Sequence, residues 1–330
     1  MKIAVLGAGA WGTALAMNWA PRHGVTLWAR DAAQCADMVA LHRNRRYLSE
    51  CELPPALSIS NDLGAVLATA DLAVVAVPIA GFRTTLKSMR ACGSGTPVIW
   101  ACKGFESGSA KFPNQIAQEE LGQGTLCGVL SGPSFALEVA RGLPTALTLA
   151  SGDAGFGAAM VAQLHSPRLR LYSSVDVTGV EVAGAVKNVM AIAAGICDGL
   201  GLGNNARAAL ITRGLAEITR LGTGLGGRPE TFMGLAGAGD LILTCTGELS
   251  RNRRVGVLLA EGWPLPEILA RLGHVAEGVL TAREALRLAQ RHGVDMPITR
   301  AVCQVLQQEM TPQAAVEVLL NRDPKAETGF

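Results

Sequence analysis

The first half of the chain alternates between short apolar runs and helical segments. Apolar runs bounded by glycine, proline or polar residues predict buried strands at 2–6, 25–30, 71–78, 97–102, 125–131, 145–150 and 168–173. Near-continuous apolar runs are typical of a parallel sheet that is covered on both faces. We therefore expect an α/β fold with an N-terminal, Rossmann-type doubly wound parallel sheet.

After about residue 178 the pattern changes to helical spacing. Helices are predicted at 179–197, 205–221, 252–261, 264–272, 278–292 and 311–320. A chain of 330 residues is too long for one ordinary core. The sequence thus predicts two domains, 1–178 and 179–330, of which the second is all-α.

A glycine motif follows the first predicted strand. Gly7, Gly9 and Gly12 form GxGxxG between that strand and a helical segment, with a second strand about thirty residues into the chain. The first glycine permits a tight turn, the second lets the backbone approach a pyrophosphate, and the third lets the helix pack on the strand. The motif predicts a dinucleotide site with the phosphates at a helix N-terminus.

The end of the second strand bears on the choice of cofactor. An acid at this point usually binds the ribose hydroxyls of NAD, whereas an arginine accommodates the 2′-phosphate of NADP. Arg30 comes first and Asp31 follows it. Arg30 therefore favours NADP, while Asp31 leaves NAD open, and a solvated surface arginine is the alternative for Arg30.

A single lysine interrupts the apolar helix predicted at 179–197. Lys187 shares its face with small or apolar residues such as Ala183, Met190 and Ala194. Such a lysine either snorkels to water or is held for a purpose. A carbonyl that receives a hydride needs a proton donor, and burial or a second cation suits lysine to this task by lowering its pKa. We expect Lys103, which follows a predicted strand, to lie near Lys187.

Other polar residues stand in contexts that favour substrate binding. Ser250 is a good N-cap for a helix from Arg251, and such a helix start, with Arg251 and Asn252, favours a phosphate. The alternative is an ordinary solvated helix end. Asp240 closes a glycine-rich stretch, where a turn aspartate is the alternative.

Ligands bind at the carboxyl ends of strands in open parallel sheets. This edge is predicted to be lined by residues that follow strands, namely Gly7, Gly9, Pro78, Lys103 and Gly132.

Composition narrows the classes of function. Hydrophobic residues make up 49% of the chain, charged residues 17%, and the formal net charge is +2, so no global field favours nucleic acid or an anionic membrane. The eight cysteines show no metal-ligand spacing, which predicts no metal site and a reducing, cytoplasmic setting. We expect no membrane span and no targeting segment.

Several motifs together resemble the bacterial-type NAD(P)-dependent glycerol-3-phosphate dehydrogenases, from the glycine motif at residue 7 to about residue 298. They are Gly7–Ala14, Leu27–Asp31, Lys103–Glu106, Ser131–Ala136, Gly184–Asn188, Gly237–Leu241, Ser250–Arg254 and Glu277–Gly278. Each is weak alone, but together and in this order they are highly specific.

The resemblance implies an NAD(P)-binding first domain and a helical substrate-binding and catalytic second domain. It implies interconversion of dihydroxyacetone phosphate and sn-glycerol 3-phosphate, which supplies phospholipid synthesis, and it suggests a homodimer. It makes Lys187 the catalytic acid/base. The implied substrate-binding residues are Lys103, Gly132, Ser134, Lys187, Asp240, Ser250, Arg251 and Asn252. The implied dinucleotide contacts, added to the glycine motif, are Ala10, Trp11, Arg30, Lys103, Ala136, Arg251, Val275 and Glu277.

Two positions depart from the pattern of similar sequences. Leu137 stands where a lysine is common, and Ala276 where a valine is usual. Leu137 removes a charge near the expected cofactor site and leaves the implied catalytic set intact.

Two rival functions are open to the same residues. One is a two-domain dehydrogenase that acts on a hydroxy acid, with Arg251 holding a carboxylate. The other is a dinucleotide-sensing regulator without turnover, which would give Lys187 no purpose on its apolar face. The basic cluster at a helix start favours a phosphate over the carboxylate of a hydroxy acid.

Overall fold

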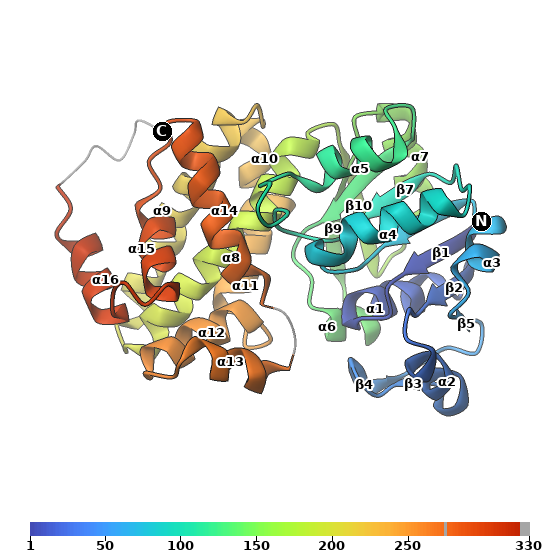
Figure 1. Ribbon diagram of the computed structural model, residues 1–330, viewed down its shortest axis with the longest axis horizontal. Coiled ribbons are helices and arrows are strands. Elements are labelled where there is room, and N and C mark those ends of the chain that lie inside the picture. The colour runs from blue at the N-terminus through green and yellow to red at the C-terminus, as the bar shows by residue number, and fades with distance from the viewer. Residues whose placement is uncertain (274–275, 324–330) are drawn as a thin grey trace. The chain divides into compact units, whose positions relative to one another are not determined.

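The computed structural model describes residues 1–273 and 276–323, which form two units (Figure 1). Unit 1 comprises Met1–Cys102 and Pro113–Val177, and unit 2 comprises Lys103–Phe112 and the described residues from Thr178 onward. The break after Val177 lies next to the predicted domain boundary. Segment 103–112 differs from the prediction, which assigned it to the first domain. It belongs to unit 2 because Phe105 and Phe112 are buried in the core of that unit.

Unit 1 is built from strands and helices that alternate along the chain. Its strands are β1 (Lys2–Leu6), β2 (Gly24–Trp28), β3 (Arg43–Asn44), β4 (Leu48–Glu52), β5 (Ser58–Ser60), β6 (Leu72–Val75), β7 (Val98–Trp100), β8 (Cys127–Ser131), β9 (Thr145–Ala150) and β10 (Leu169–Ser174). Its helices are α1 (Ala10–Trp19), α2 (Ala32–Leu41), α3 (Leu63–Ala68), α4 (Ile79–Ala91), α5 (Pro113–Leu121), α6 (Ala136–Ala140) and α7 (Ala154–Leu164).

The main sheet confirms the Rossmann-type expectation, with one difference. Its strand order is β10-β9-β8-β7-β6-β1-β2-β5, and the strands from β8 to β5 are all paired in parallel. Taken in chain order, these six strands have the spatial order 3-2-1-4-5-6. The pairing of β8 with β9 is antiparallel, so the sheet is mixed and β9 and β10 run the opposite way. Apolar runs do not reveal strand direction, which is why the sequence predicted a purely parallel sheet.

Side chains of the central strands alternate between two covered faces. Ile99 belongs to a core cluster with Leu15 of α1 and Phe156 of α7. The next residue, Trp100, packs edge-on against Phe82 of α4, with ring centroids 5.8 Å apart. Period-two alternation sends neighbours in a strand to opposite faces, so apolar runs are required where both faces are covered.

The sequence did not predict β5 or the antiparallel β3–β4 pair. β5 lies at the sheet edge and is three residues long, two of them serines, and none of the three is buried. β3 and β4 carry mainly polar residues. None of these segments has the apolar run on which the predictions rested.

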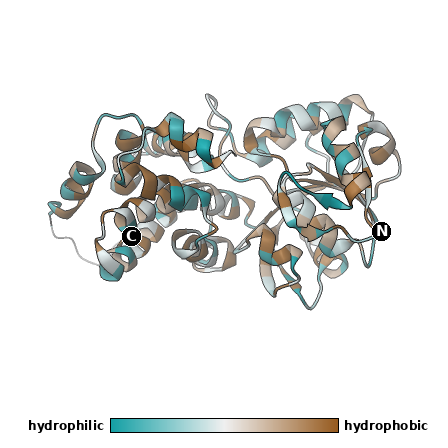
Figure 2. Cartoon of the chain, turned by 90° about the horizontal axis from the view of Figure 1, so that it is seen from below, coloured by the Kyte–Doolittle hydropathy of each residue, from teal (hydrophilic) through white to brown (hydrophobic). Residues whose placement is uncertain are grey.

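All the regular elements of unit 2, within its described residues, are helices. Its helices are α8 (Val177–Gly199), α9 (Gly203–Gly224), α10 (Pro229–Met233), η1 (Leu235–Gly239, a π-helical turn), α11 (Asp240–Thr246), α12 (Arg251–Ala260), α13 (Leu265–Leu272), α14 (Glu277–Arg291), α15 (Pro297–Leu306) and α16 (Pro312–Leu320). Figure 2 shows both teal and brown along these helices, as expected for elements that bury one face. The sequence reading missed α10, η1, α11 and α15, which are short or begin at glycine and proline.

Helix α8 forms the centre of unit 2. Its residues from Gly179 to Cys197 are all buried. By length and composition it is apolar enough to cross a membrane, yet its most apolar stretch is completely buried inside the protein. A core helix has the same properties, so α8 is weak evidence for a membrane span.

Helices α8 and α12 cross at backbone distance. A Cβ on Gly195 would lie 1.9 Å from the carbonyl oxygen of Arg253, and a Cβ on Gly256 would lie 2.0 Å from that of Ile192. Any side chain at either position would push the helices apart. These glycines therefore fix the distance between α8 and the first turns of α12.

A buried carboxylate joins α9 to the start of α15. Glu217 accepts hydrogen bonds from the backbone N–H groups of Ile298 (2.6 Å) and Thr299 (3.2 Å) and from the Thr299 hydroxyl (3.1 Å). It thus satisfies donors that a helix start leaves unpaired. Burial nevertheless raises the pKa of Glu217 from its ordinary 4.5 to about 7.

We predict that Glu217 makes the stability of the protein fall as the pH rises. Between pH 4.5 and about 7 the folded protein retains a proton on Glu217 that the unfolded chain has lost. This group then lowers the free energy of unfolding by at most about 1.4 kcal/mol per pH unit. Urea denaturation across this window should show the stability advantage of the wild type over Glu217→Gln shrinking as the pH rises. Exposed Glu317→Gln serves as the control, and an advantage that stays constant or grows would contradict the prediction.

Candidate functional site

The glycine motif of unit 1 forms a tight turn between β1 and α1. Gly7 has a φ of +120°, and a Cβ on Gly12 would lie 2.0 Å from the Gly7 carbonyl oxygen. No atom lies within 4 Å of the place a Cβ on Gly9 would occupy. Gly9 is the N-cap of α1 and has no side chain to bind the first N–H groups of the helix. Open space beside an uncapped helix N-terminus fits a pyrophosphate group.

The residues after β2 differ in how they are used. Arg30 is exposed, whereas the Asp31 carboxylate accepts hydrogen bonds from the backbone N–H groups of Ala33 (2.9 Å) and Gln34 (3.3 Å). Asp31 also forms an ion pair with Arg46 at 3.4 Å. Asp31 thus caps α2, and Arg30 is the group that extends toward solvent.

The strand–helix turn after β8 carries three more of the predicted residues. Gly132 has a φ of +141°, and its carbonyl oxygen accepts a hydrogen bond from the Ser134 hydroxyl at 3.1 Å. Ala136 begins α6, and Leu137, one of the two unusual positions, packs with it against a small core that includes Val139. Leu137 is therefore accommodated as an apolar contact.

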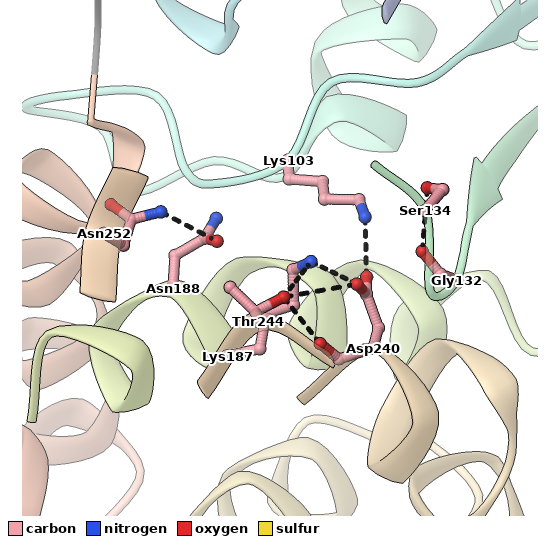
Figure 3. A network of polar contacts seen from close by, with 8 residues as sticks. All are labelled: Lys103, Gly132, Ser134, Lys187, Asn188, Asp240, Thr244 and Asn252. Atoms are coloured by element: carbon pink, nitrogen blue, oxygen red, sulfur yellow. Dashed lines mark hydrogen bonds and ion pairs between the residues drawn. The ribbon is translucent and has the colours of Figure 1, made fainter. Parts of the chain in front are cut away.

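Two lysines share one buried carboxylate in unit 2 (Figure 3). Lys187 of α8 donates to Asp240 Oδ1, and Lys103 donates to Asp240 Oδ2 at 2.6 Å. Lys187 also donates to the Thr244 hydroxyl at 2.9 Å. The exposed fraction of the side chain is 8% for Lys187, 16% for Lys103 and 1% for Asp240. Lys187 is therefore held inside the protein and does not snorkel to water.

Backbone geometry fixes the position of Asp240. The π-helical turn η1 ends at Gly239, so Asp240 is the first residue of α11. A Cβ on Gly237 would lie 2.1 Å from the Phe232 carbonyl oxygen, so this turn requires glycine. Thr244 follows Asp240 by one helical turn, and its hydroxyl donates to the Asp240 carbonyl oxygen at 2.6 Å. Isolated π-helical turns are frequent at functional sites.

Burial lowers the pKa of Lys187 from 10.5 to about 7. The charge of Asp240 opposes this shift, and the nearby charge of Lys103 adds to it. The neighbouring Cys245 remains a neutral thiol, because burial raises its pKa to about 12. Lys187 is thus able to gain and lose a proton near neutral pH.

An amide chain links α8, α12 and α14. The Asn252 Nδ2 donates to Asn188 Oδ1 at 3.1 Å, and Asn252 Oδ1 accepts from the Gly278 backbone N–H at 3.0 Å. Asn188 directly follows Lys187, and Gly278 directly follows Glu277, the half-buried first residue of α14. A Cβ on Gly278 would lie 2.6 Å from the Asn188 carbonyl oxygen, so the three helices meet closely here.

The start of α12 confirms the predicted cap. The Ser250 hydroxyl accepts a hydrogen bond from the Arg253 backbone N–H at 3.3 Å. Arg251 is exposed and Asn252 is buried. The Arg253 side chain is engaged elsewhere, since its Nε donates to Asp198 at 2.7 Å. An exposed arginine at a helix N-terminus is suited to an anion.

The predicted site residues thus fall into two groups. Unit 1 holds Gly7, Gly9, Ala10, Trp11, Gly12, Arg30, Gly132, Ser134 and Ala136, and unit 2 holds Lys103, Lys187, Asp240, Ser250, Arg251, Asn252 and Glu277. Val275 lies outside the described residues.

Sequence reasoning missed Thr244 and Asn188 as members of the unit 2 site. The helical spacing of Thr244 from Asp240 was the available signal for the first. Within the described residues, no group of three potential metal ligands is present.

Comparisons with known proteins agree on one family. Residues 2–156 match the family model of the NAD-dependent glycerol-3-phosphate dehydrogenase N-terminus, and residues 176–317 match that of its C-terminus. A glycerol-3-phosphate dehydrogenase (NAD(P)+) from Nitrosospira multiformis is 60% identical over 99% of each chain. One from Aromatoleum aromaticum is 56% identical over 99% of this chain and 100% of the relative.

A solved structure of the same family is similar to this chain along almost its whole length. The crystal structure of glycerol-3-phosphate dehydrogenase from Coxiella burnetii has a TM-score of 0.93 and 43% sequence identity, and it covers 97% of this chain and 99% of that one. The ternary structure of D-mandelate dehydrogenase, at 15% identity and a TM-score of 0.64, shares the fold alone. Both halves match the family models, and relatives match along 99% of the chain, so the chain belongs to the NAD-dependent glycerol-3-phosphate dehydrogenase family.

Proposed function

We propose that this protein reduces dihydroxyacetone phosphate to sn-glycerol 3-phosphate with NADPH or NADH, reversibly. The observation that carries the proposal is the Lys187–Asp240–Lys103 cluster, with a lysine pKa lowered to about 7, in a member of this family. The product is the backbone of glycerophospholipids, and we propose that the enzyme supplies their synthesis.

Residues of unit 1 are suited to hold the dinucleotide. The open space at Gly9 and the N-terminus of α1 fit its pyrophosphate, and exposed Arg30 fits a 2′-phosphate. The Asp31 carboxylate already caps α2, which supports a preference for NADPH. Gly7, Gly12, Ala10 and Trp11 belong to the same turn and the start of α1, and Ala136 begins α6. These residues, with Lys103, Arg251, Val275 and Glu277, complete the proposed set. The cofactor, when bound, supplies the hydride.

Residues of unit 2 are suited to bind the substrate and move the proton. Arg251, at the N-terminus of α12, is proposed to bind the phosphate, together with Ser250 and Asn252. The hydrogen bond from Asn252 to Asn188 places this helix start next to the residue that follows Lys187. The family resemblance also proposes Gly132 and Ser134 of unit 1 as substrate contacts.

Lys187 is proposed to donate a proton to the carbonyl oxygen as negative charge develops on it. With both lysines protonated, Lys187, Lys103 and Asp240 carry a net charge of +1, which favours that oxygen in the transition state. Asp240 orients both ammonium groups through separate carboxylate oxygens. The Thr244 hydroxyl fixes the Lys187 side chain from the other direction.

A cytoplasmic homodimer is proposed on the family resemblance. All eight cysteines are free thiols in the structure, which supports a reducing compartment.

The proposed function is tested by following NADPH and then NADH absorbance after dihydroxyacetone phosphate is added to the purified protein. Turnover is expected with both, with a higher kcat/KM for NADPH because of Arg30. The ratio should fall toward one in Arg30→Ala. Tight NADPH binding without turnover would favour the sensor class, and turnover of a 2-keto acid alone would favour the hydroxy-acid rival.

We predict that Lys187→Met lowers kcat by roughly 10²–10⁴-fold, the usual contribution of a positioned proton donor. The exposed Lys87→Met of α4 removes the same charge elsewhere and is expected to retain wild-type kcat. A loss below tenfold at saturating substrate would remove Lys187 from the proposed role.

The rate of dihydroxyacetone phosphate reduction should fall as the pH rises through about 7, since Lys187 must be protonated. Lys103→Met removes a charge that lowers the pKa of Lys187. We therefore expect the alkaline limb of the pH–rate profile to move to higher pH in this variant and to stay in place in Lys87→Met. An unmoved limb in Lys103→Met would count against the pairing of the two lysines.

Two glycine variants separate cofactor binding from stability. A methyl at Gly9 meets no protein atom, so Gly9→Ala should change the free energy of unfolding by less than about 0.5 kcal/mol. It should weaken NADPH binding roughly tenfold or more, because the backbone approaches the pyrophosphate there. Gly12→Ala should lower both stability and affinity. Fluorescence titration and denaturation measure the two quantities, and undiminished NADPH affinity in Gly9→Ala would contradict the assignment.

A further inference from the structure

Lys103 reaches Asp240 from a segment whose position is set by unit 2. The chain leaves unit 1 after Cys102 and returns to it at Pro113, and the residues between belong to unit 2. Asp240 accounts for one contact of this segment, but a single flexible lysine side chain does not hold a ten-residue excursion in place. The other contacts of the segment therefore decide where the Lys103 ammonium lies.

The segment has an internal turn. The backbone N–H of Glu106 donates to the Lys111 carbonyl oxygen, and that of Ala110 donates to the Glu106 carbonyl oxygen, both at 2.9 Å. Gly108 lies at the tip with a φ of +85°. Phe105 and Phe112 flank the turn and contact each other edge-on in the core of unit 2. The two rings anchor the base of the turn and leave the tip to be held by other groups.

A charged pair on α14 forms hydrogen bonds with both the backbone N–H and the carbonyl oxygen of Gly108. Glu284 Oε1 accepts a hydrogen bond from the Gly108 N–H, and Arg287 donates one to the Gly108 carbonyl oxygen, each at 3.0 Å. The two side chains also pair with each other, Arg287 to Glu284 Oε2, at 3.0 Å. The Glu284 side chain is 4% exposed, and these two contacts use both of its carboxylate oxygens. A carboxylate this buried is retained only with such partners.

Helix α14 also contacts the substrate side of unit 2. Its Gly278 N–H binds Asn252, and Glu284 and Arg287 stand further along the same helix. One rigid helix thus holds both the amide chain that ends at Asn188 and the tip of the segment that carries Lys103. If segment 103–112 shifted on α14, Lys103 would be displaced relative to Asp240.

We propose that Glu284 and Arg287 are positioning residues for the proposed reductase. Their hydrogen bonds to Gly108 hold segment 103–112 against α14 and thereby keep the Lys103 ammonium group in contact with Asp240. The part of this inference that concerns turnover rests on the proposed function. The part that concerns the seat of the segment does not.

The test is a double-mutant cycle with Lys103. Glu284→Ala should lower kcat/KM for dihydroxyacetone phosphate roughly ten- to a hundredfold in the wild-type background, as expected for a misplaced catalytic group. In a Lys103→Met background the same change should cost less than about twofold, because the group it positions is absent. Equal losses in the two backgrounds would show that Glu284 acts through something other than Lys103.

A second variant guards against a folding defect in Glu284→Ala. Arg287 is 37% exposed, so Arg287→Met removes the bond to the Gly108 carbonyl oxygen with little disturbance of the core. Arg291→Met, at an exposed position of the same helix, is the matched control. Arg287→Met should show the same background-dependent loss, and Arg291→Met should show none. Full activity in Arg287→Met would overturn its assignment.

Hydrogen–deuterium exchange supplies a readout that needs no turnover. Exchange of peptides covering 103–112 should rise in Glu284→Ala and Arg287→Met and match the wild type in Arg291→Met. Unchanged exchange in both Glu284→Ala and Arg287→Met would reject the proposal outright. If the wild-type protein failed to reduce dihydroxyacetone phosphate, the proposed function would fall, and the exchange result would still decide whether α14 holds the segment.

Discussion

The chemistry of unit 2 depends on a buried carboxylate that is held between two ammonium groups. Asp240 is almost completely buried, and an isolated charge there would be very costly. Lys187 from α8 and Lys103 from a distant segment of the chain each neutralise one carboxylate oxygen. The dependence is mutual, because Lys187 is also buried and tolerates its charge only beside Asp240. The two opposing effects leave Lys187 with a pKa near neutrality.

This arrangement requires the helix backbones to be placed precisely, and close backbone contacts at glycines fix several of these positions. Gly195 and Gly256 let α8 and α12 approach to a distance that excludes any side chain. Gly237 permits the close backbone contact within the π-helical turn that delivers Asp240 to the start of α11. Such contacts act on whole helices, so they place several functional side chains at once.

The sequence predicted what local patterns encode. Apolar runs located seven of the eight strands of the main sheet. Helical spacing located six helices of unit 2, including the two longest, and Ser250 was found as a cap from its position alone. Strand direction and the short polar strand β5 have no such signal, because they depend on pairing between distant segments. Lys187 stood out as a lysine in an apolar helix.

The partners of that lysine were harder to find. Thr244 depended on knowing that a helix begins at Asp240 in a glycine-rich stretch. The contacts of Gly108 with Glu284 and Arg287 join residues about 180 positions apart and leave no trace in local spacing. The assignment of 103–112 to unit 2 escaped prediction for the same reason, since the segment is flanked on both sides by elements of unit 1.

The path of the chain between the units has a consequence for synthesis. Residues 103–112 leave the ribosome well before α8 and the rest of unit 2, yet their two phenylalanines are buried only in the core of that later unit. The nascent first unit must therefore display an apolar loop until the helices that cover it have been made. A fragment cut at residue 177 would keep this loop exposed permanently, whereas the helical half alone would lack both Lys103 and part of its own core.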